Sequence, residues 1–133
     1  MDPKFCAAVE AYRNGEDDEP LAALLESEAD IVPAIAELFR GEADPDVRAF
    51  LVRVAWERGE QCSVDVIIEA LGDPAEEVWQ SALDGTVALA SPEILEVLHA
   101  AKLQERPDAA TARRFQMCVE EAILYVEGLV RAR

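Results

Sequence analysis

The sequence repeats one helix-start pattern, and this repetition constrains the fold more than any other feature. The first copy is Asp44-Pro45-Asp46-Val47-Arg48, and the second is Asp73-Pro74-Ala75-Glu76-Glu77-Val78. Pro74 lies 29 residues after Pro45. In each copy the Asp side chain can cap free backbone N–H groups, and Pro suits the first helical position because no hydrogen bond is lost there. Apolar residues at helical spacing follow both copies. A helical pattern that restarts at this period predicts stacked helix pairs, an α-solenoid.

Caps, prolines and glycines divide the whole chain into about eight expected helices. Helix starts are predicted at Asp2-Pro3, Pro20, Asp30, Asp44-Pro45, Ser63, Asp73-Pro74, Ser91-Pro92 and Pro107-Asp108. Helix ends are predicted at Gly15, Gly41, Gly59 and Gly72. The apolar faces include Leu21, Leu24 and Leu25 in the second helix, Val47, Phe50, Leu51, Val54 and Ala55 in the fourth, and Val64, Ile67, Ile68 and Leu71 in the fifth. No run alternates apolar and polar residues, so the predicted fold class is all-α.

The charge of the chain restricts its partners. The 133 residues include 28 Asp and Glu against 12 Lys and Arg, which gives a net charge of -16. Because DNA and RNA phosphates would be repelled, nucleic acid is excluded as a direct ligand. The excess favours a basic protein partner, with solubility alone as the alternative. The apolar content of 51% excludes a disordered chain.

Cysteine usage and the chain start indicate a reducing, cytoplasmic location. Cys6, Cys62 and Cys118 are odd in number and far apart, with no C-x-x-C spacing, so neither a disulfide framework nor a zinc site is predicted. The start, Met1-Asp2-Pro3-Lys4, lacks the basic and apolar regions of a signal peptide. No apolar run approaches the length of a membrane span, so no membrane contact is expected.

The sequence contains no recognisable catalytic or cofactor site. His99 is the only histidine and has no evident acid or nucleophile partner. The adjacent pairs Glu76-Glu77 and Glu120-Glu121 cannot face each other on a helix, so an acid/base dyad is not expected. There is no Gly-rich phosphate loop. We therefore predict a protein that is not an enzyme, with no cofactor and no metal.

The helix pair that contains the first copy of the pattern resembles a HEAT repeat. Ile31-Val32-Pro33-Ala34-Ile35 lies in its first helix, and Asp44-Pro45-Asp46-Val47-Arg48 opens its second. The resemblance implies a short right-handed α-solenoid of about eight helices in antiparallel pairs, with the second helix of each pair on the concave side. It also implies a single domain over 1–133, with a degenerate cap at about 1–29 and repeats at about 30–60, 61–90 and 91–133.

The second copy departs from the HEAT pattern at Trp79. Where the family has Arg after Val, this chain has Arg48 in the first copy and Trp79 in the second, so the Asp–Arg contacts between repeats are expected to be incomplete. Trp79 adjoins Val78 and is predicted to lie in the core. Gly85, inside the same helix, costs about 1 kcal/mol relative to Ala and is expected to allow a close helix crossing.

Aligning the two copies predicts a partner-binding ridge. Positions i, i+4 and i+7 on the fourth helix lie away from most of its apolar stripe, and matching positions on the sixth helix would stack beside them. Trp beside Arg on such a ridge is typical of a binding hot spot. The alternative is that Trp56 packs against an adjacent helix as ordinary core. The predicted partner-binding residues are Ala49, Arg53, Trp56, Gln80, Asp84, Val87 and Glu120.

A second resemblance concerns function. The run Trp79-Gln80-Ser81-Ala82-Leu83-Asp84-Gly85 is similar to a variant in small bacterial HEAT-like proteins, and small acidic proteins of this kind resemble immunity proteins of toxin systems. The resemblance implies an inhibitor that neutralises a basic toxin or effector by binding it. A general adaptor or scaffold is the alternative, followed by a HEAT-like protein of the bilin-lyase type.

Overall fold

The chain folds into helices throughout the part that the structure describes. A computed structural model describes residues 3–15, 32–59 and 63–132. These ranges contain α1 (Pro3–Arg13), α3 (Val32–Gly41), α4 (Pro45–Arg58), α5 (Ser63–Leu71), α6 (Glu76–Ala88), α7 (Pro92–Lys102) and α8 (Ala109–Arg131), and no strand. The predicted all-α class is confirmed. The expected second helix with Leu21, Leu24 and Leu25, the starts at Asp2, Pro20 and Asp30, and Cys62 lie outside the described residues.

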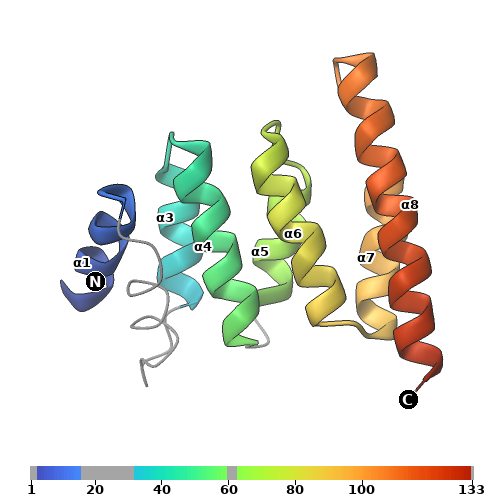
Figure 1. Cartoon of the computed structure of the whole chain (residues 1–133), viewed down its shortest axis with the longest axis horizontal. Helices are drawn as coiled ribbons and strands as arrows, with labels where there is room; N and C mark the ends of the chain where they lie inside the picture. The colour runs from blue at the N-terminus through green and yellow to red at the C-terminus, as the bar shows by residue number, and fades with distance from the viewer. Residues whose placement is uncertain (1–2, 16–31, 60–62, 133) are drawn as a thin grey trace.

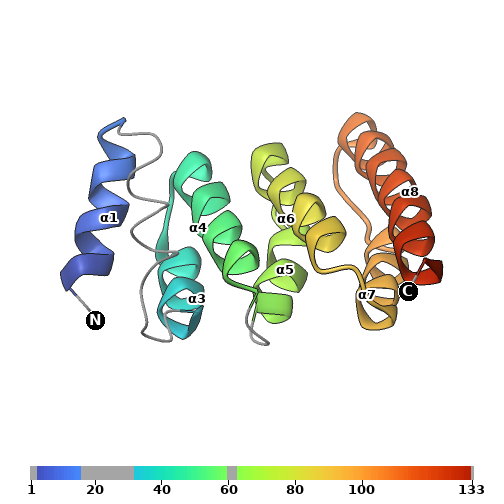
Figure 2. The same ribbon diagram turned by 60° about the horizontal axis from the view of Figure 1, so that its bottom comes forward.

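Consecutive helices pack against each other in two layers. α3 packs on α4, α5 on α6 and α7 on α8. Figure 1 shows α4, α6 and α8 side by side in one layer, with α3, α5 and α7 behind them, and Figure 2 shows the same two layers from another side. Contacts also run along each layer, from α4 through α6 to α8 and from α5 to α7. α1 packs beside α4 at one end of the row.

Local capping interactions begin and end several helices where the sequence predicts them. The side-chain oxygens of Asp44, Ser91 and Asp108 accept hydrogen bonds from backbone N–H groups in the first turns of α4, α7 and α8, at 3.0 to 3.1 Å. Gly59 ends α4 in the left-handed conformation, with φ at 67°, and its N–H donates to the carbonyl of Trp56. A residue with a side chain is strained in that conformation, so glycine is favoured here.

Asp73 and Ser63, two predicted caps, also bind groups on neighbouring helices. The Asp73 carboxylate accepts a hydrogen bond from the backbone N–H of Ala75 at 2.9 Å, the same local contact that Asp44 makes. α6 begins at Glu76 rather than at Pro74, and its N-cap residue, Ala75, makes no side-chain capping bond. Asp73 is buried and binds the guanidinium of Arg48 through both carboxylate oxygens, at 3.1 and 3.2 Å. Ser63 is the first residue of α5, and its hydroxyl donates to the carbonyl of Ala55 at 2.5 Å. Both side chains therefore connect helices to their neighbours in space.

The core runs between the two layers. The predicted apolar stripe of α4 is buried, and Val52 is buried as well, because α6 packs along a second side of this helix. Trp79 is fully buried and meets the ring of Phe115 edge to face, with centroids 5.2 Å apart, so its predicted core position is confirmed. Ile68 is 48% exposed while Ile67 is buried, and its assignment to the core was wrong. One residue along a helix turns the side chain by about 100°.

Arg106 precedes Pro107 before α8, where the residue that precedes Pro before α4 and before α6 is Asp. Before the second helix of the three successive pairs, the chain has Asp44-Pro45, Asp73-Pro74 and Arg106-Pro107. Its guanidinium carbon lies 4.0 Å from the ring centroid of Phe115 and 5.9 Å from that of Trp79. The same group donates to the carbonyl of Asp73 at 2.8 Å and to that of Leu71.

The two junctions between helix pairs therefore use different contacts. Arg48 in α4 meets Asp73 in the loop before α6, whereas Trp79 in α6 meets Arg106 in the loop before α8. At the first junction the arginine is on the helix and the aspartate is in the loop. At the second junction the arginine is in the loop, and the helix position that corresponds to Arg48 carries the aromatic ring of Trp79. Burial lowers the pKa of the Arg106 guanidinium, and the carboxylate of Asp73 opposes that shift.

Candidate protein-binding face

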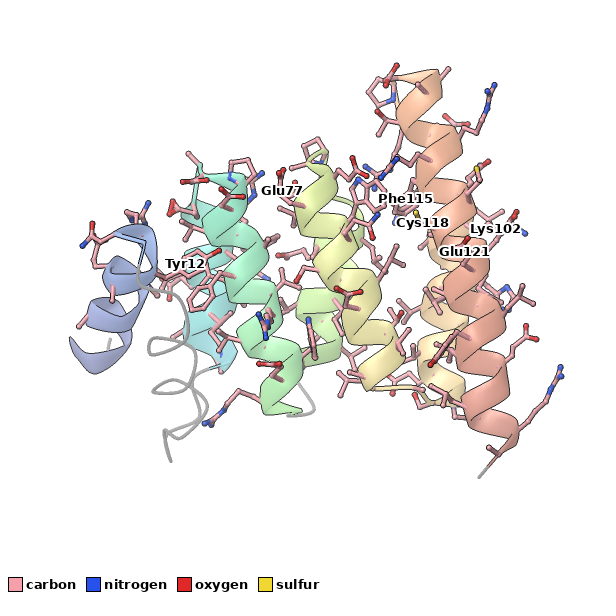
Figure 3. All side chains as sticks on the ribbon, viewed as in Figure 1. Tyr12, Glu77, Lys102, Phe115, Cys118 and Glu121 are labelled. Carbon is pink, nitrogen blue, oxygen red and sulfur yellow. The ribbon has the colours of Figure 1, made fainter. Side chains whose placement is uncertain are left out.

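Six of the seven predicted partner-binding residues come from two neighbouring helices of one layer. We call them the α4–α6 face: Ala49, Arg53, Trp56, Gln80, Asp84 and Val87. Figure 3 shows the side chains of this layer along α4 and α6. The Ser81 hydroxyl donates to the carbonyl of Ala49 at 3.0 Å, which holds the two helices close together.

Glu120 does not join this face. Its carboxylate lies 3.3 Å from the ammonium of Lys102, which belongs to α7 in the other layer. The contact places Glu120 on the side of α8 that packs towards α7. The sequence alignment between repeats did not extend to α8, so the geometry of that helix was not predictable from it.

Trp56 is half-buried because its ring crosses α6 at Gly85. A Cβ atom at position 85 would lie 2.8 Å from Cδ1 and 2.9 Å from Cγ of the Trp56 ring. Gly85 therefore leaves room for the Trp56 ring, and the atoms nearest to it belong to side chains. The indole Nε1 is buried without a hydrogen-bond partner among the described residues. Trp56 thus packs on a neighbouring helix and also keeps part of its surface in contact with solvent.

Arg53 in α4 and Asp84 in α6 carry opposite charges on this face and influence each other electrostatically. Arg53 is exposed, and its Nε lies 3.5 Å from the carboxylate of Glu57 on the same helix. Neighbouring atoms shield the Asp84 carboxyl from part of the solvent and raise its pKa, while the charge of Arg53 opposes this shift.

The raised pKa of Asp84 predicts an unusual pH dependence. The folded state holds this proton more tightly than the unfolded state, so ionised Asp84 lowers the stability of the fold as pH rises through its folded pKa. The free energy of unfolding of Asp84→Asn, minus that of the parent chain, should therefore increase when the pH is raised from 3 to 7. Because the side chain is exposed, a gain of a few tenths of a kcal/mol, roughly, is expected. Urea denaturation at the two pH values measures it.

Asp108→Asn provides the control of opposite sign. Hydrogen bonds from Thr111 lower the pKa of Asp108. Its carboxylate therefore stabilises the fold above its unfolded pKa, and that stability is lost as pH falls through the folded pKa. Asp108→Asn should lose stability relative to the parent chain over the same rise in pH. A shift of both variants in one direction would contradict the assignment of Asp84.

A groove on the opposite layer was not predicted. It lies between α5 and α7 and has a volume of about 370 Å³. Its lining residues are Ile68, Leu71, Glu93, Glu96, Val97, Ala100, Ala101 and Gln104. The sequence signal for this groove was a second isoleucine, Ile68, directly after the buried Ile67. The apolar pattern of α5 alone could not show which of the two isoleucines faces the core.

The described residues show no cluster of chemical groups like those of metal sites. Within residues 3–15, 32–59 and 63–132, no three His, Cys, Asp or Glu side chains group closely enough to hold a metal ion. His99 is exposed on α7. No helix in these ranges is long and apolar enough to cross a membrane.

Comparison with protein-family models, curated proteins and solved structures finds no match to this chain.

Proposed function

We propose that this chain is a protein-binding module without enzymatic activity, and that it binds a basic protein through the α4–α6 face. The observation that carries the proposal is the distribution of charge. Seven basic side chains already lie within 3.5 Å of a carboxylate of the same chain: Arg13, Arg40, Arg48, Arg53, Lys102, Arg114 and Arg131. The net charge of -16 leaves a large acidic excess beyond these pairs. Such an excess attracts a basic partner and accelerates encounter with it.

The packing of the helices supports a HEAT-like α-solenoid as the framework of this module. The helices form two layers with consecutive pairs in contact, and Arg48 reaches the Asp of the next repeated pattern. A stack of helix pairs offers a rigid and extended surface for a partner. The proposed organisation is one domain with a cap at about 1–29 and repeats at about 30–60, 61–90 and 91–133.

Within this class we favour a dedicated inhibitor, of the kind that neutralises a toxin or effector in the cytoplasm. Trp56 is partly exposed beside Arg53, and Asp84 lies near enough to feel the charge of Arg53, so the three form the small aromatic and charged cluster expected at a binding hot spot. A dedicated inhibitor should hold its partner in high salt, because buried apolar contacts persist when surface charges are screened. A general adaptor should release its partners under the same conditions.

Trp56→Ala tests the face directly. As a hot spot, Trp56 should contribute about 2 kcal/mol or more to binding, so the dissociation constant of the partner should rise about 30-fold. Isothermal titration calorimetry with the captured partner measures the change, and circular dichroism should show unchanged helical content. Loss of the fold would instead support the interpretation of Trp56 as core.

A pair of charge variants keeps the test decisive if Trp56→Ala unfolds. Asp84→Asn removes one carboxylate from the α4–α6 face, and Glu96→Gln removes one from the groove on the other layer. Both change the net charge equally, so general attraction to a basic partner weakens equally. Asp84→Asn should weaken binding more than Glu96→Gln. Equal effects would place the partner elsewhere on the molecule.

A further inference from the structure

The outer face of α8 carries a symmetric stripe of exposed residues. Relative to Met117, its members stand at positions -7, -4, 0, +4 and +7, which are neighbours along one side of a helix. Met117 and Leu124 are large apolar residues with 59% and 71% of their surface exposed. The stripe consists of Ala110, Arg113, Met117, Glu121 and Leu124, and all five residues are exposed.

No described helix covers this stripe. α8 lies at the end of the row in both ribbon views (Figures 1 and 2). On one flank of α8, Gln80 of α6 donates to the sulfur of Cys118 at 3.6 Å, and on the other flank Glu120 pairs with Lys102 of α7. The stripe faces away from both helices. Residues around Met117 form an open hollow of about 470 Å³, lined by Ala110, Arg113, Arg114, Met117, Cys118 and Glu121.

The charges of the stripe are complementary to a reversed copy of themselves. Arg113 and Glu121 have no ion-pair partner within the described residues, whereas the flanking Arg114 is already paired with Glu76. Arg113 and Glu121 stand four residues to either side of Met117. An antiparallel copy related by a two-fold axis at Met117 would set Arg113 of each chain opposite Glu121 of the other. It would also set Ala110 opposite Leu124 and bring the two Met117 side chains together.

We propose that this face binds a second copy of the chain through an antiparallel α8–α8 contact centred on Met117. Both Arg113–Glu121 pairs form in the same arrangement, as an isologous interface requires. Two chains of charge -16 repel each other at long range, so the dimer is weak at low salt. At about 0.15 M salt the screening length is about 8 Å, which weakens the repulsion and affects contacting pairs less. The proposal is independent of the α4–α6 face and of any basic partner.

Charge reversal and complementation test the contact. Sedimentation equilibrium in 0.15 M salt, at roughly 10 µM to 1 mM protein, should show the mass rise from 14.6 kDa towards about twice that value. Arg113→Glu and Glu121→Arg each create two like-charge pairs and should each raise the dissociation constant about tenfold or more. An equimolar mixture of the two variants restores both Arg–Glu pairs and should dimerise as the parent chain does.

A cysteine at the axis tests the orientation. In a chain with Cys6, Cys62 and Cys118 replaced by Ser, Met117→Cys should cross-link under mild oxidation. Leu124→Cys should not, because the two copies of that position lie about 21 Å apart in an antiparallel pair, at 1.5 Å per residue. Cross-linking of both variants would indicate a parallel pair and overturn the proposal. A parent chain that stays monomeric at 1 mM, or a mixture that stays monomeric, would also overturn it.

Discussion

Replacing Arg106 by Ala is expected to lower the free energy of unfolding by about 3 kcal/mol, from two charge-assisted hydrogen bonds and a cation–aromatic contact. The guanidinium binds the carbonyls of Leu71 and Asp73 after α5 and covers the ring of Phe115 in α8. One side chain thus joins the end of α5, the loop before α6 and the N-terminal half of α8. Urea denaturation with an unchanged m-value would measure the loss as stability rather than altered compactness.

Two further substitutions define what the Arg106 result means. Arg106→Lys keeps the charge but lacks the planar fork that reaches two carbonyls, so it should recover less than half of the loss. Arg40→Ala breaks an exposed ion pair with Glu69 and should cost less than about 1 kcal/mol. If Arg106→Ala costs no more than Arg40→Ala, the junction between α6 and α8 does not depend on this contact.

Gly85→Val is expected to destabilise the fold by about 3 kcal/mol through overpacking. A Cβ at this position would already lie 2.8 Å from the Trp56 ring and 3.0 Å from Cδ1 of Ile67. The two additional methyl groups of Val leave no room for α4 and α6 to keep their separation. Thermal and urea denaturation of the variant should both report the loss.

The effect of Gly85→Ala on stability should have opposite signs with and without the Trp56 ring, which would show that Trp56 is the reason for the glycine. Ala has a helix propensity about 1 kcal/mol better than Gly. In the parent chain Gly85→Ala should still destabilise, because the new Cβ collides with the Trp56 ring. In a Trp56→Ala background the same substitution should stabilise. Equal destabilisation in both backgrounds would mean that another contact, such as Ile67, requires the glycine.

Features that depend on a few adjacent residues were predictable from the sequence. The caps at Asp44, Ser91 and Asp108 bind backbone groups within three residues of themselves, so sequence alone determines them. Trp79 adjoins Val78 on an apolar stripe, and its complete burial followed from that position. A packing requirement at Gly85 was predictable because an interior glycine costs helix stability, but the ring of Trp56 as its neighbour was not.

Features that depend on distant contacts were not predictable in the same way. Asp73 accepts the backbone N–H of Ala75 as its sequence context predicts, but its second role, the pairing with Arg48, and the start of α6 at Glu76 were not predictable. Ile68 fits the apolar pattern of α5 yet faces a groove towards α7. Glu120 pairs with Lys102 because of the way α8 packs on α7. In each case the deciding partner lies on another helix.

Arg106 lies between these two situations. Its place before Pro107, where Asp44 and Asp73 precede Pro in the earlier copies, is visible in the sequence. Trp79 at the position of Arg48 is visible as well. Joining the two departures into one contact requires knowing that the loop before α8 reaches α6. The sequence thus shows both substitutions, Trp79 for Arg and Arg106 for Asp, and the packing of the helices brings the two side chains together.

The binding of a basic protein is tested most directly by affinity capture from a lysate of the source organism. Parent chain and Trp56→Ala serve as paired baits, at low and at high salt, with quantitative mass spectrometry of the retained proteins. We predict one basic protein in stoichiometric amount on the parent chain, retained in high salt and strongly depleted on Trp56→Ala. Capture of no basic protein, or of the same proteins in equal amounts by both baits, would contradict the proposed function.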